Sequence, residues 1–213
     1  MFLIGTIFLV YPVIINFIYN QDIKRVQGQY FENIEIGDSL ADLYNLLYLY
    51  NIELYKNKQS KLIDPFSYSQ PNFDLSEYGI SDNCIGFISI DKINITLPIY
   101  LGANRDNMKK GAVHLTQTSF PIGGKNTNSV IAAHRGSVYS MFRNIHKLEI
   151  GDYIIIKNFK ELLEYQVCEI KIINPWDVDE LLIQEGRDLI TLISCHPFSQ
   201  NSQRYVVYCE RIV

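Results

Sequence analysis

The sequence predicts a mainly β fold that closes into a barrel. After Asn83 the chain alternates between short apolar runs and clusters of Gly, Asn, Pro and Lys, which is the pattern of an all-β domain. The runs follow one another closely, as in a closed barrel, where no strand is left with an exposed edge. A turn is predicted at Gly123-Gly124 and a short helix over 139–148. The predicted strands are 85–90, 93–99, 129–134, 153–157, 163–173, 188–195 and 204–212.

Length and composition are those of one modest globular domain with appendages. The 213 residues are 47% apolar, enough to bury a core, and the net charge at pH 7 is −4. A nucleic-acid-binding domain carries a basic patch, so neither DNA nor RNA is an expected partner. Three regions are predicted: an N-terminal transmembrane anchor over 1–19, a helical region with a loop over 20–83, and the barrel domain over 84–213.

The first segment has the composition of a membrane anchor. Residues 2–18 include no charged side chain, and their number is close to the roughly 20 residues that cross a bilayer. A cleaved signal peptide has a shorter apolar stretch and a small-residue cleavage site, so an uncleaved anchor is favoured. Lys24 and Arg25 follow the segment and no positive charge precedes it. Taken alone, the positive-inside rule would place the body of the protein in the cytoplasm.

An amphipathic helix and a loop are predicted between anchor and barrel. Gly37-Asp38-Ser39 is an N-capping sequence, and apolar residues then recur at helical spacing up to about Lys56. The polar segment 57–61 ends this pattern. The loop that follows contains Asp64-Pro65-Phe66, and Asp-Pro is by itself a common turn former.

A thiol and a positive charge are predicted at one edge of the barrel. Cys195 ends an apolar strand, and Arg204 opens the next strand after a short loop. If these strands pair, a nucleophilic sulfur and a fixed cation lie at the same edge, which indicates acyl transfer. Arg135 and Arg211 are alternatives to Arg204 as the cation beside the thiol. Arg135 would point away from His134 if the strand continued, and Arg211 lies far along the last strand, so Arg204 is preferred.

An imidazole suited to this thiol follows another apolar strand at His134. A histidine pKa of about 6.5 and a thiol pKa of about 8.5 would let the two share a proton near neutral pH. His196 is the alternative base, but neighbouring strand residues face opposite sides, so it is expected to line the groove instead. His114 and His146 are interpreted as packing residues.

The remaining cysteines and histidines give no indication of a metal. Cys84, Cys168 and Cys209 lack CxxC spacing, and none of the histidines accompanies a cysteine pair at ligand spacing, so we expect neither metal nor cofactor. Cys168 and Cys209 lie in apolar runs, where a free cysteine is a small buried hydrophobe. A disulfide between them is the open alternative.

Several motifs resemble those of the sortases, cysteine transpeptidases of Gram-positive bacteria. Ala133-His134-Arg135-Gly136, the run 191–195 and the downstream Arg204 match in order, and similarity extends from Ile85 to Ile212. The resemblance implies a closed eight-stranded barrel with short helices. It also implies that Cys195 is the nucleophile, His134 the general acid and base, and Arg204 the donor that holds the substrate carbonyl or oxyanion.

The loop is similar to the lid of class C sortases, the branch that polymerises pili. By that resemblance, Asp64 pairs with Arg204, Pro65 stiffens the loop and Phe66 covers Cys195. Near the nucleophile the chain departs from the family, with Ser194 in place of a threonine and His196-Pro197-Phe198 in place of Thr-Pro-Tyr. Ser194, His196 and Phe198 are therefore possible groove residues that affect substrate preference.

The resemblance implies that Cys195 cleaves an LPXTG-like sorting signal through a thioester and that pilin subunits are then joined by lysine isopeptide bonds. The implied partners are pilins with sorting signals and acceptor lysines, together with the membrane that holds the anchor. The catalytic domain would then be extracellular. The alternatives are a sortase that attaches single proteins to cell-wall peptide, a hydrolytic cysteine protease, and a non-catalytic membrane-anchored pilus scaffold.

Overall fold

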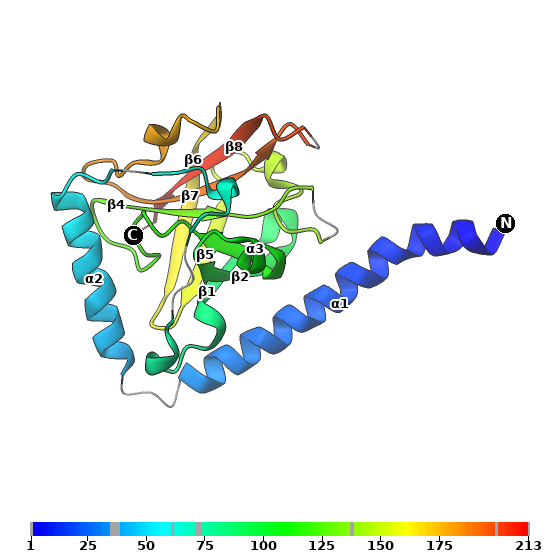
Figure 1. Cartoon of the computed structure of the whole chain (residues 1–213), viewed down its shortest axis with the longest axis horizontal. Helices are drawn as coiled ribbons and strands as arrows, with labels where there is room; N and C mark the ends of the chain where they lie inside the picture. Colours follow the sequence, from blue (N-terminus) through cyan, green and yellow to red (C-terminus); the bar gives the residue numbers. More distant parts are fainter. Residues whose placement is uncertain are drawn as a thin grey trace.

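A closed barrel of eight strands forms the body of the described chain in the computed structural model (Figure 1). The structure describes residues 2–34, 39–60, 62–70, 74–136, 139–198 and 200–212. The strands are β1 (Cys84–Ile90), β2 (Ile95–Leu101), β3 (Ala112–His114), β4 (Thr127–Ala132), β5 (Tyr153–Asn158), β6 (Leu162–Ile173), β7 (Asp188–His196) and β8 (Gln203–Arg211). Around the barrel they follow the order β1-β2-β3-β4-β7-β8-β6-β5. The prediction of a closed eight-stranded barrel is confirmed.

Two strand pairs are parallel, β2 with β3 and β4 with β7, and the other neighbours are antiparallel. Every residue of β4 is buried, and so is β7 from Leu189 to Ser194. Such continuous burial is typical of parallel strands that are covered on both faces. By contrast, β5 alternates between buried and more exposed side chains, because only one of its faces meets the core.

At three places the predicted strands differ from the structure by more than one residue. β3 has only three residues and no sequence-based prediction identified it. The strand predicted over 93–99 begins later because Asp91–Ile93 forms a 3₁₀ turn, which Asn94 ends in the left-handed region at a φ of 52°. The strand predicted over 129–134 ends at Ala132, so His134 lies in the following loop.

Helices and short 3₁₀ turns surround the barrel. They are α1 (Phe2–Ile34), α2 (Leu40–Lys56), α3 (Arg105–Lys110), η1 (Pro65–Ser67), η2 (Ser76–Tyr78), η3 (Ser81–Asn83), η4 (Asp91–Ile93), η5 (Ile145–Lys147) and η6 (Val178–Leu181). Of the helix predicted over 139–148, only the 3₁₀ turn η5 is present.

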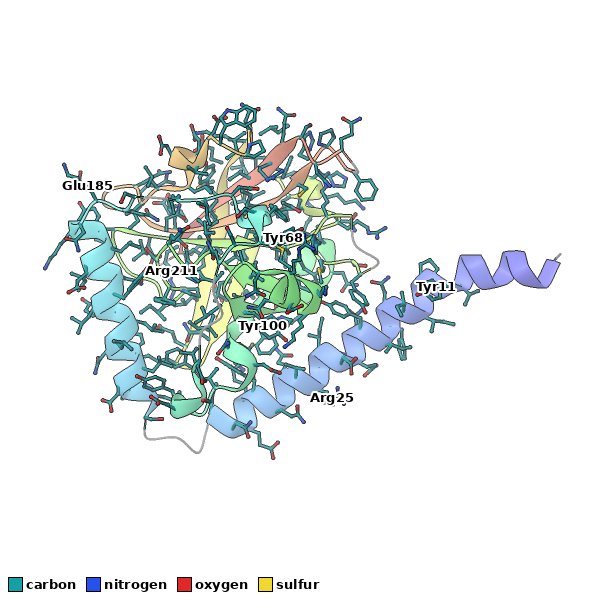
Figure 2. All side chains as sticks on the ribbon, in the orientation of Figure 1. Tyr11, Arg25, Tyr68, Tyr100, Glu185 and Arg211 are labelled. Carbon is teal, nitrogen blue, oxygen red and sulfur yellow. The ribbon has the colours of Figure 1, made fainter. Side chains whose placement is uncertain are left out.

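Helix α1 runs well past residue 19, the predicted end of the anchor. Its second half packs on the barrel: the hydroxyl of Tyr30 donates to the carbonyl of Ile85 over 2.9 Å, and the ring of Tyr19 stacks on Tyr139 at 4.2 Å. Its first half extends away from the barrel, as the position of Tyr11 shows (Figure 2). Among the described residues, no helix combines the length and the apolar character needed to cross a bilayer, and the predicted anchor is not confirmed.

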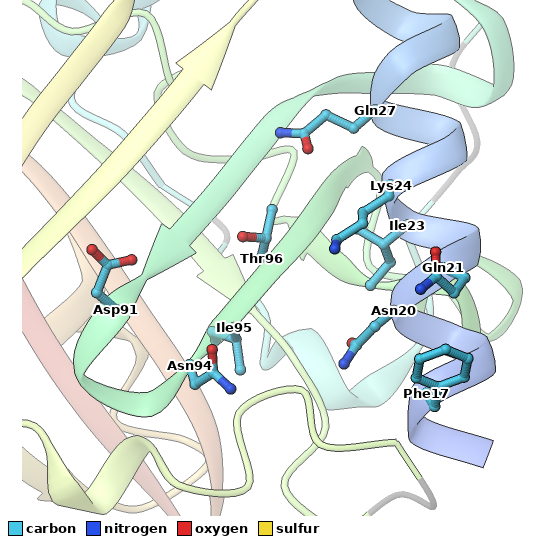
Figure 3. Close-up of a pocket in the computed structure, with 10 residues that line it drawn as sticks. All are labelled: Phe17, Asn20, Gln21, Ile23, Lys24, Gln27, Asp91, Asn94, Ile95 and Thr96. Carbon is cyan, nitrogen blue, oxygen red and sulfur yellow. The ribbon is translucent and has the colours of Figure 1, made fainter. Parts of the chain in front are cut away.

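A hollow of about 340 Å³ separates α1 from the turn between β1 and β2 (Figure 3). Most side chains that line it are polar, with amides from Asn20, Gln27 and Asn94 and a charge from Lys24. Neither a thiol nor an imidazole lines the hollow, so it is not a candidate for acyl transfer.

Helix α2 packs its apolar side on the barrel through Leu43 and Leu47, both buried. Its buried Asn51 exchanges hydrogen bonds with the backbone of Phe120, donating over 3.2 Å and accepting over 2.8 Å. The helix ends at Lys56 as predicted, but the side chain of Ser39 makes no capping hydrogen bond. Gly37 and Asp38 lie outside the described residues.

Candidate active site

The parallel pairing of β4 and β7 brings His134 and Cys195 to the same edge of the barrel. Ala132 is the register partner of Ile193, and the backbone amide of Ala133 donates to the carbonyl of Ile193 over 3.3 Å. Two residues beyond this pair, the chains reach His134 and Cys195. Because parallel strands end at the same sheet edge, residues 61 positions apart in sequence lie at one site.

A cavity of about 390 Å³ opens at this edge, and both side chains line it. Cys195 and His134 are each partly exposed, so the sulfur is accessible to a ligand and not sealed inside the barrel. The complete lining consists of Tyr68, His134, Arg135, Gly136, Cys195, Phe198 and Asn201. Phe198, a predicted groove residue, belongs to this set.

Arg204 lies directly opposite Cys195 in the ladder between β7 and β8. Its guanidinium makes a bidentate ion pair with Asp64, in which Nε and Nη2 each donate to one carboxylate oxygen over 2.7 Å. Nη1 donates to the carbonyls of Asn201 and Gln203 over 2.9 and 2.8 Å. Four donations therefore occupy a group with five N–H bonds, and the face that would hold a carbonyl oxygen is filled by Asp64.

Phe66 covers this ion pair, with its ring 5.0 Å from the centre of the Arg204 guanidinium. The same ring lies 6.3 Å from the imidazole of His134, and Tyr68 lies 6.3 Å from that imidazole as well. The loop therefore places one aromatic ring on Arg204 and two beside His134. Pro65 is buried at the start of η1, where its fixed φ suits the turn.

Sequence reasoning missed Tyr68, the loop residue that lines the cavity with Cys195. Its backbone is in the left-handed region at a φ of 56°, which turns the chain sharply after η1. Burial raises the pKa of its phenol, and the neighbouring Cys195 adds to the shift. An aromatic residue just after Asp-Pro-Phe is the signal that could have identified it.

Two glutamines hold the loop at its ends. The side chain of Gln59 donates to the carbonyl of Gln117 over 2.9 Å and accepts from the amide of Ile183 over 2.9 Å. The buried Gln70 accepts from the amides of Ala103 and Thr116 over 3.1 and 2.9 Å. The segment that carries Asp64 and Phe66 is therefore fixed at both ends.

Electrostatics in the closed site favour a neutral thiol. Burial raises the pKa of Cys195 to about 11; Arg204 and Arg135 oppose that shift, and Asp64 reinforces it. Burial also lowers the pKa of His134. The expectation that thiolate and imidazolium are both populated near neutral pH is therefore wrong for this closed state. In this conformation both shifts favour the uncharged thiol and the uncharged imidazole.

Two of the predicted groove residues lie elsewhere. Ser194 is fully buried and donates to the carbonyl of Ala133 over 2.8 Å, so the prediction that it lines the groove is wrong. Its side chain lies on the opposite face of β7 from that of Cys195, because side chains alternate along a strand. His196 is not among the residues that line the cavity; instead it contacts Arg135, which does line it.

Arg135 was expected to point away from His134 if the strand continued, and that condition is not met, since both residues line the same cavity. The expectation rested on a strand that continues through residue 134, whereas β4 ends at Ala132 and the alternation of strand side chains no longer applies. Arg211 lies at the far end of β8, where it stacks at 5.5 Å on the ring of Tyr165. The structure therefore brings Arg135, Arg204, His134 and Cys195 together and leaves Arg211 apart.

None of the four cysteines forms a disulfide. Cys209 is fully buried in the core, and the thiol of Cys168 donates to the carbonyl of Tyr208 over 3.3 Å. The alternative of a bridge between Cys168 and Cys209 is therefore excluded in this structure.

Comparisons with a family model, with relatives in sequence and with solved structures all identify sortases. A model of the sortase domain matches residues 88–212. Sortase D of Bacillus subtilis (strain 168) is 30% identical over 131 residues, a match that covers 60% of this chain and 63% of the relative. Less than two thirds of that relative's length is thus matched.

Two solved structures are similar across most of their length. Sortase C1 of GBS pilus island 1 superimposes with a TM-score of 0.79 at 32% identity, covering 88% of this chain and 90% of that one. Sortase C of Streptococcus pneumoniae gives a TM-score of 0.78 at 33% identity, covering 89% of this chain and 97% of that one.

Proposed function

This chain belongs to the sortase family of cysteine transpeptidases, and we propose that it is a class C enzyme that cleaves an LPXTG-like sorting signal and joins pilin subunits through lysine isopeptide bonds. The observation that carries the proposal is the bidentate pair between Asp64 and Arg204, which lies beside Cys195 in a barrel similar to those of pilus sortases. A loop that occupies the substrate-binding face of Arg204 suits an enzyme that is inactive until its protein substrate arrives.

The reaction begins when the lid moves and Asp64 leaves Arg204. Loss of the carboxylate removes one cause that raises the pKa of Cys195, and entry of water reduces the effect of burial, the largest cause. The thiol can then pass its proton to His134 and attack the carbonyl carbon of the scissile peptide bond. The freed guanidinium of Arg204 donates to the oxygen that becomes negative in this step.

Collapse of the tetrahedral intermediate breaks the carbon–nitrogen bond. His134 gives its proton to the leaving amine, and the acyl group stays on Cys195 as a thioester. An incoming lysine amine then attacks the thioester and loses a proton to His134. The products are an amide bond on the lysine side chain and the free enzyme, with the proton returned to the sulfur.

Mass spectrometry of the product tests this proposal. The full chain is incubated with a sorting-signal peptide and with a lysine peptide from a pilin, with cell-wall peptide, or with no amine. We expect an isopeptide product with the pilin lysine and a thioester adduct on Cys195 that is absent in His134→Ala. A product with cell-wall peptide alone would identify an anchoring sortase, release of free acid in every mixture would identify a protease, and no adduct would identify a non-catalytic scaffold.

We also propose that the barrel works on the outer side of the cell membrane, held there by the N-terminal segment. The support is a set of apolar side chains that are about half exposed or more on the part of α1 beyond the barrel, namely Val10, Tyr11, Val13, Ile14, Phe17 and Ile18. Protease treatment of intact cells tests the location: digestion of the barrel without lysis supports it, and protection until lysis contradicts it.

A further inference from the structure

Arg135 is a buried cation without a carboxylate partner. The residue is 7% exposed, yet none of the described Asp or Glu side chains forms an ion pair with it. Its Nε is fully buried and has no hydrogen-bond partner. A buried charge is normally paired, because desolvation without a counter-ion is unfavourable. The cavity beside Arg135 is therefore expected to receive negative charge during the reaction.

His196 and Tyr205 hold the guanidinium in place. Nη1 of Arg135 lies 3.0 Å from Nδ1 of His196, and the guanidinium lies 5.5 Å from the centre of the Tyr205 ring. Arginine can only donate, so Nδ1 of His196 accepts this hydrogen bond and the imidazole is neutral. Burial lowers the pKa of His196, and the charges of Arg135 and His146 lower it further. The histidine that accepts from Arg135 is thus uncharged and leaves the charge of the guanidinium uncompensated.

The two arginines at the cavity differ in their availability. Arg204 is neutralised by Asp64 while the lid is closed, whereas Arg135 lines the cavity with Cys195 and carries its full charge. The other titratable groups near the sulfur are His134 and Tyr68, and burial lowers the pKa of the first and raises that of the second. The closed site therefore has one free cation among the described residues that face the thiol.

We propose that Arg135, positioned by His196, is a second cation of the active site that stabilises the anionic sulfur of Cys195 independently of Arg204. This inference rests on the proposed function, in which Cys195 is the nucleophile. The replacement of the family's threonine by His196 supplies the acceptor that fixes the guanidinium. Arg135 is thus an electrostatic residue that lowers the pKa of Cys195 in the closed site as well as in the open one, and so favours the thiolate once the lid moves.

The pH dependence of alkylation at Cys195 tests the inference. Iodoacetamide reacts with the thiolate, so its rate reports the fraction ionised. In the full chain we expect Arg135→Gln to reduce the rate at pH 7.5 on the order of tenfold, as a rise of one pKa unit would. Arg135→Lys should retain most of the rate, and Arg25→Gln, which removes a surface charge on α1, should leave it unchanged.

A second comparison covers the case in which Arg135→Gln does not fold, as judged by circular dichroism. His196→Gln keeps an oxygen that can accept from Nη1, whereas His196→Ala removes the acceptor. We expect near wild-type alkylation in the first variant and a several-fold reduction in the second. Equal rates in these two variants, or an unchanged pH midpoint in folded Arg135→Gln, would overturn the inference.

These outcomes are separate from failure of the proposed function. If Arg135 plays no part, Cys195 still forms a thioester with the sorting-signal peptide and only the alkylation profiles stay unchanged. If no variant, nor the wild-type chain, forms a thioester, the proposed function fails, whatever the alkylation profiles show.

Discussion

Cys195 and Arg204 are register partners on the antiparallel strands β7 and β8, and in the closed protein the guanidinium beside the sulfur is turned toward Asp64. The proposed nucleophile and its cation are thus on two strands that pair without a bulge, and strand pairing fixes their separation. Asp64, which we propose acts as the switch, lies on a loop. Under this proposal, control of the reaction depends on the position of one carboxylate and needs no rearrangement of the barrel.

Asp64→Ala is expected to activate the thiol. The substitution removes both the ion pair that holds the lid and a negative charge that raises the pKa of Cys195. Because burial and Asp64 raise that pKa to about 11, the rate of alkylation of the wild-type chain should still increase with pH well above pH 8. In the variant, the midpoint should move to lower pH, and labelling at pH 7.5 should accelerate on the order of tenfold.

The matched control for the lid is Glu77→Ala, which removes an exposed carboxylate from the segment after the lid. Its labelling rate should equal that of the wild type. Phe66→Ala should also accelerate labelling of Cys195, because loss of the ring that packs on Arg204 weakens the attachment of the lid. Unchanged rates in both lid variants would contradict the role of the lid and leave the transpeptidase chemistry intact.

Loss of Arg204 should impair chemistry without affecting the thiol's accessibility. The comparison is made in the Asp64→Ala background, where the lid is already released, by adding Arg204→Gln. Removal of a donor to a developing oxyanion reduces the rate on the order of a hundredfold or more, so thioester formation with a sorting-signal peptide should fall by that factor. Rapid-quench mass spectrometry measures it, and a reduction below threefold would exclude Arg204 from this role.

Cys195→Ala should abolish the thioester, whereas Cys209→Ala should retain it. Cys209 is buried in the core with a pKa raised well above its usual range, which makes it inert as a nucleophile. Its truncation leaves a small cavity and should lower the free energy of unfolding by about 1 kcal/mol. Thioester on any cysteine other than Cys195 would overturn the assignment of the nucleophile.

Much of the barrel could be predicted, because its strands are apolar runs bounded by turn residues. β3 was not predicted, because three residues are too few to show a periodic pattern of apolar side chains. The continuation of α1 to Ile34 was not predicted. The second half of this helix has a polar exposed side and contacts the barrel through single residues such as Ile23 and Tyr30. Such tertiary contacts leave no regular pattern in the sequence.

The candidate site, like the barrel, was predictable from the sequence only in part. Cys195, His134 and Arg204 follow from strand ends and a resemblance, since parallel β4 and β7 carry their ends to one edge. The place of Arg135 depended on where β4 stops, and strand ends are the least certain part of a prediction from sequence. The resting ionisation state depended on burial and on Asp64, neither of which spacing along the chain can reveal.

Acid should weaken the fold through His114, a histidine in the core. It is fully buried, its Nε2 lies 2.8 Å from the carbonyl of Ser119, and burial lowers its pKa to about 4. In the unfolded chain the same imidazole has a pKa of about 6.5 and binds a proton first. Its contribution to stability is therefore complete above pH 6.5 and declines as the pH falls toward 4, by up to about 3 kcal/mol.

Urea unfolding of the wild type at several values between pH 7.5 and 4.5 measures this decline. His114→Gln removes the titrating group, so its free energy of unfolding should depend less on pH in that window, by up to about 1.4 kcal/mol per pH unit. His146→Gln, at an exposed histidine on η5, is the control and should keep the wild-type slope. An unchanged slope in His114→Gln would assign the acid sensitivity to other groups.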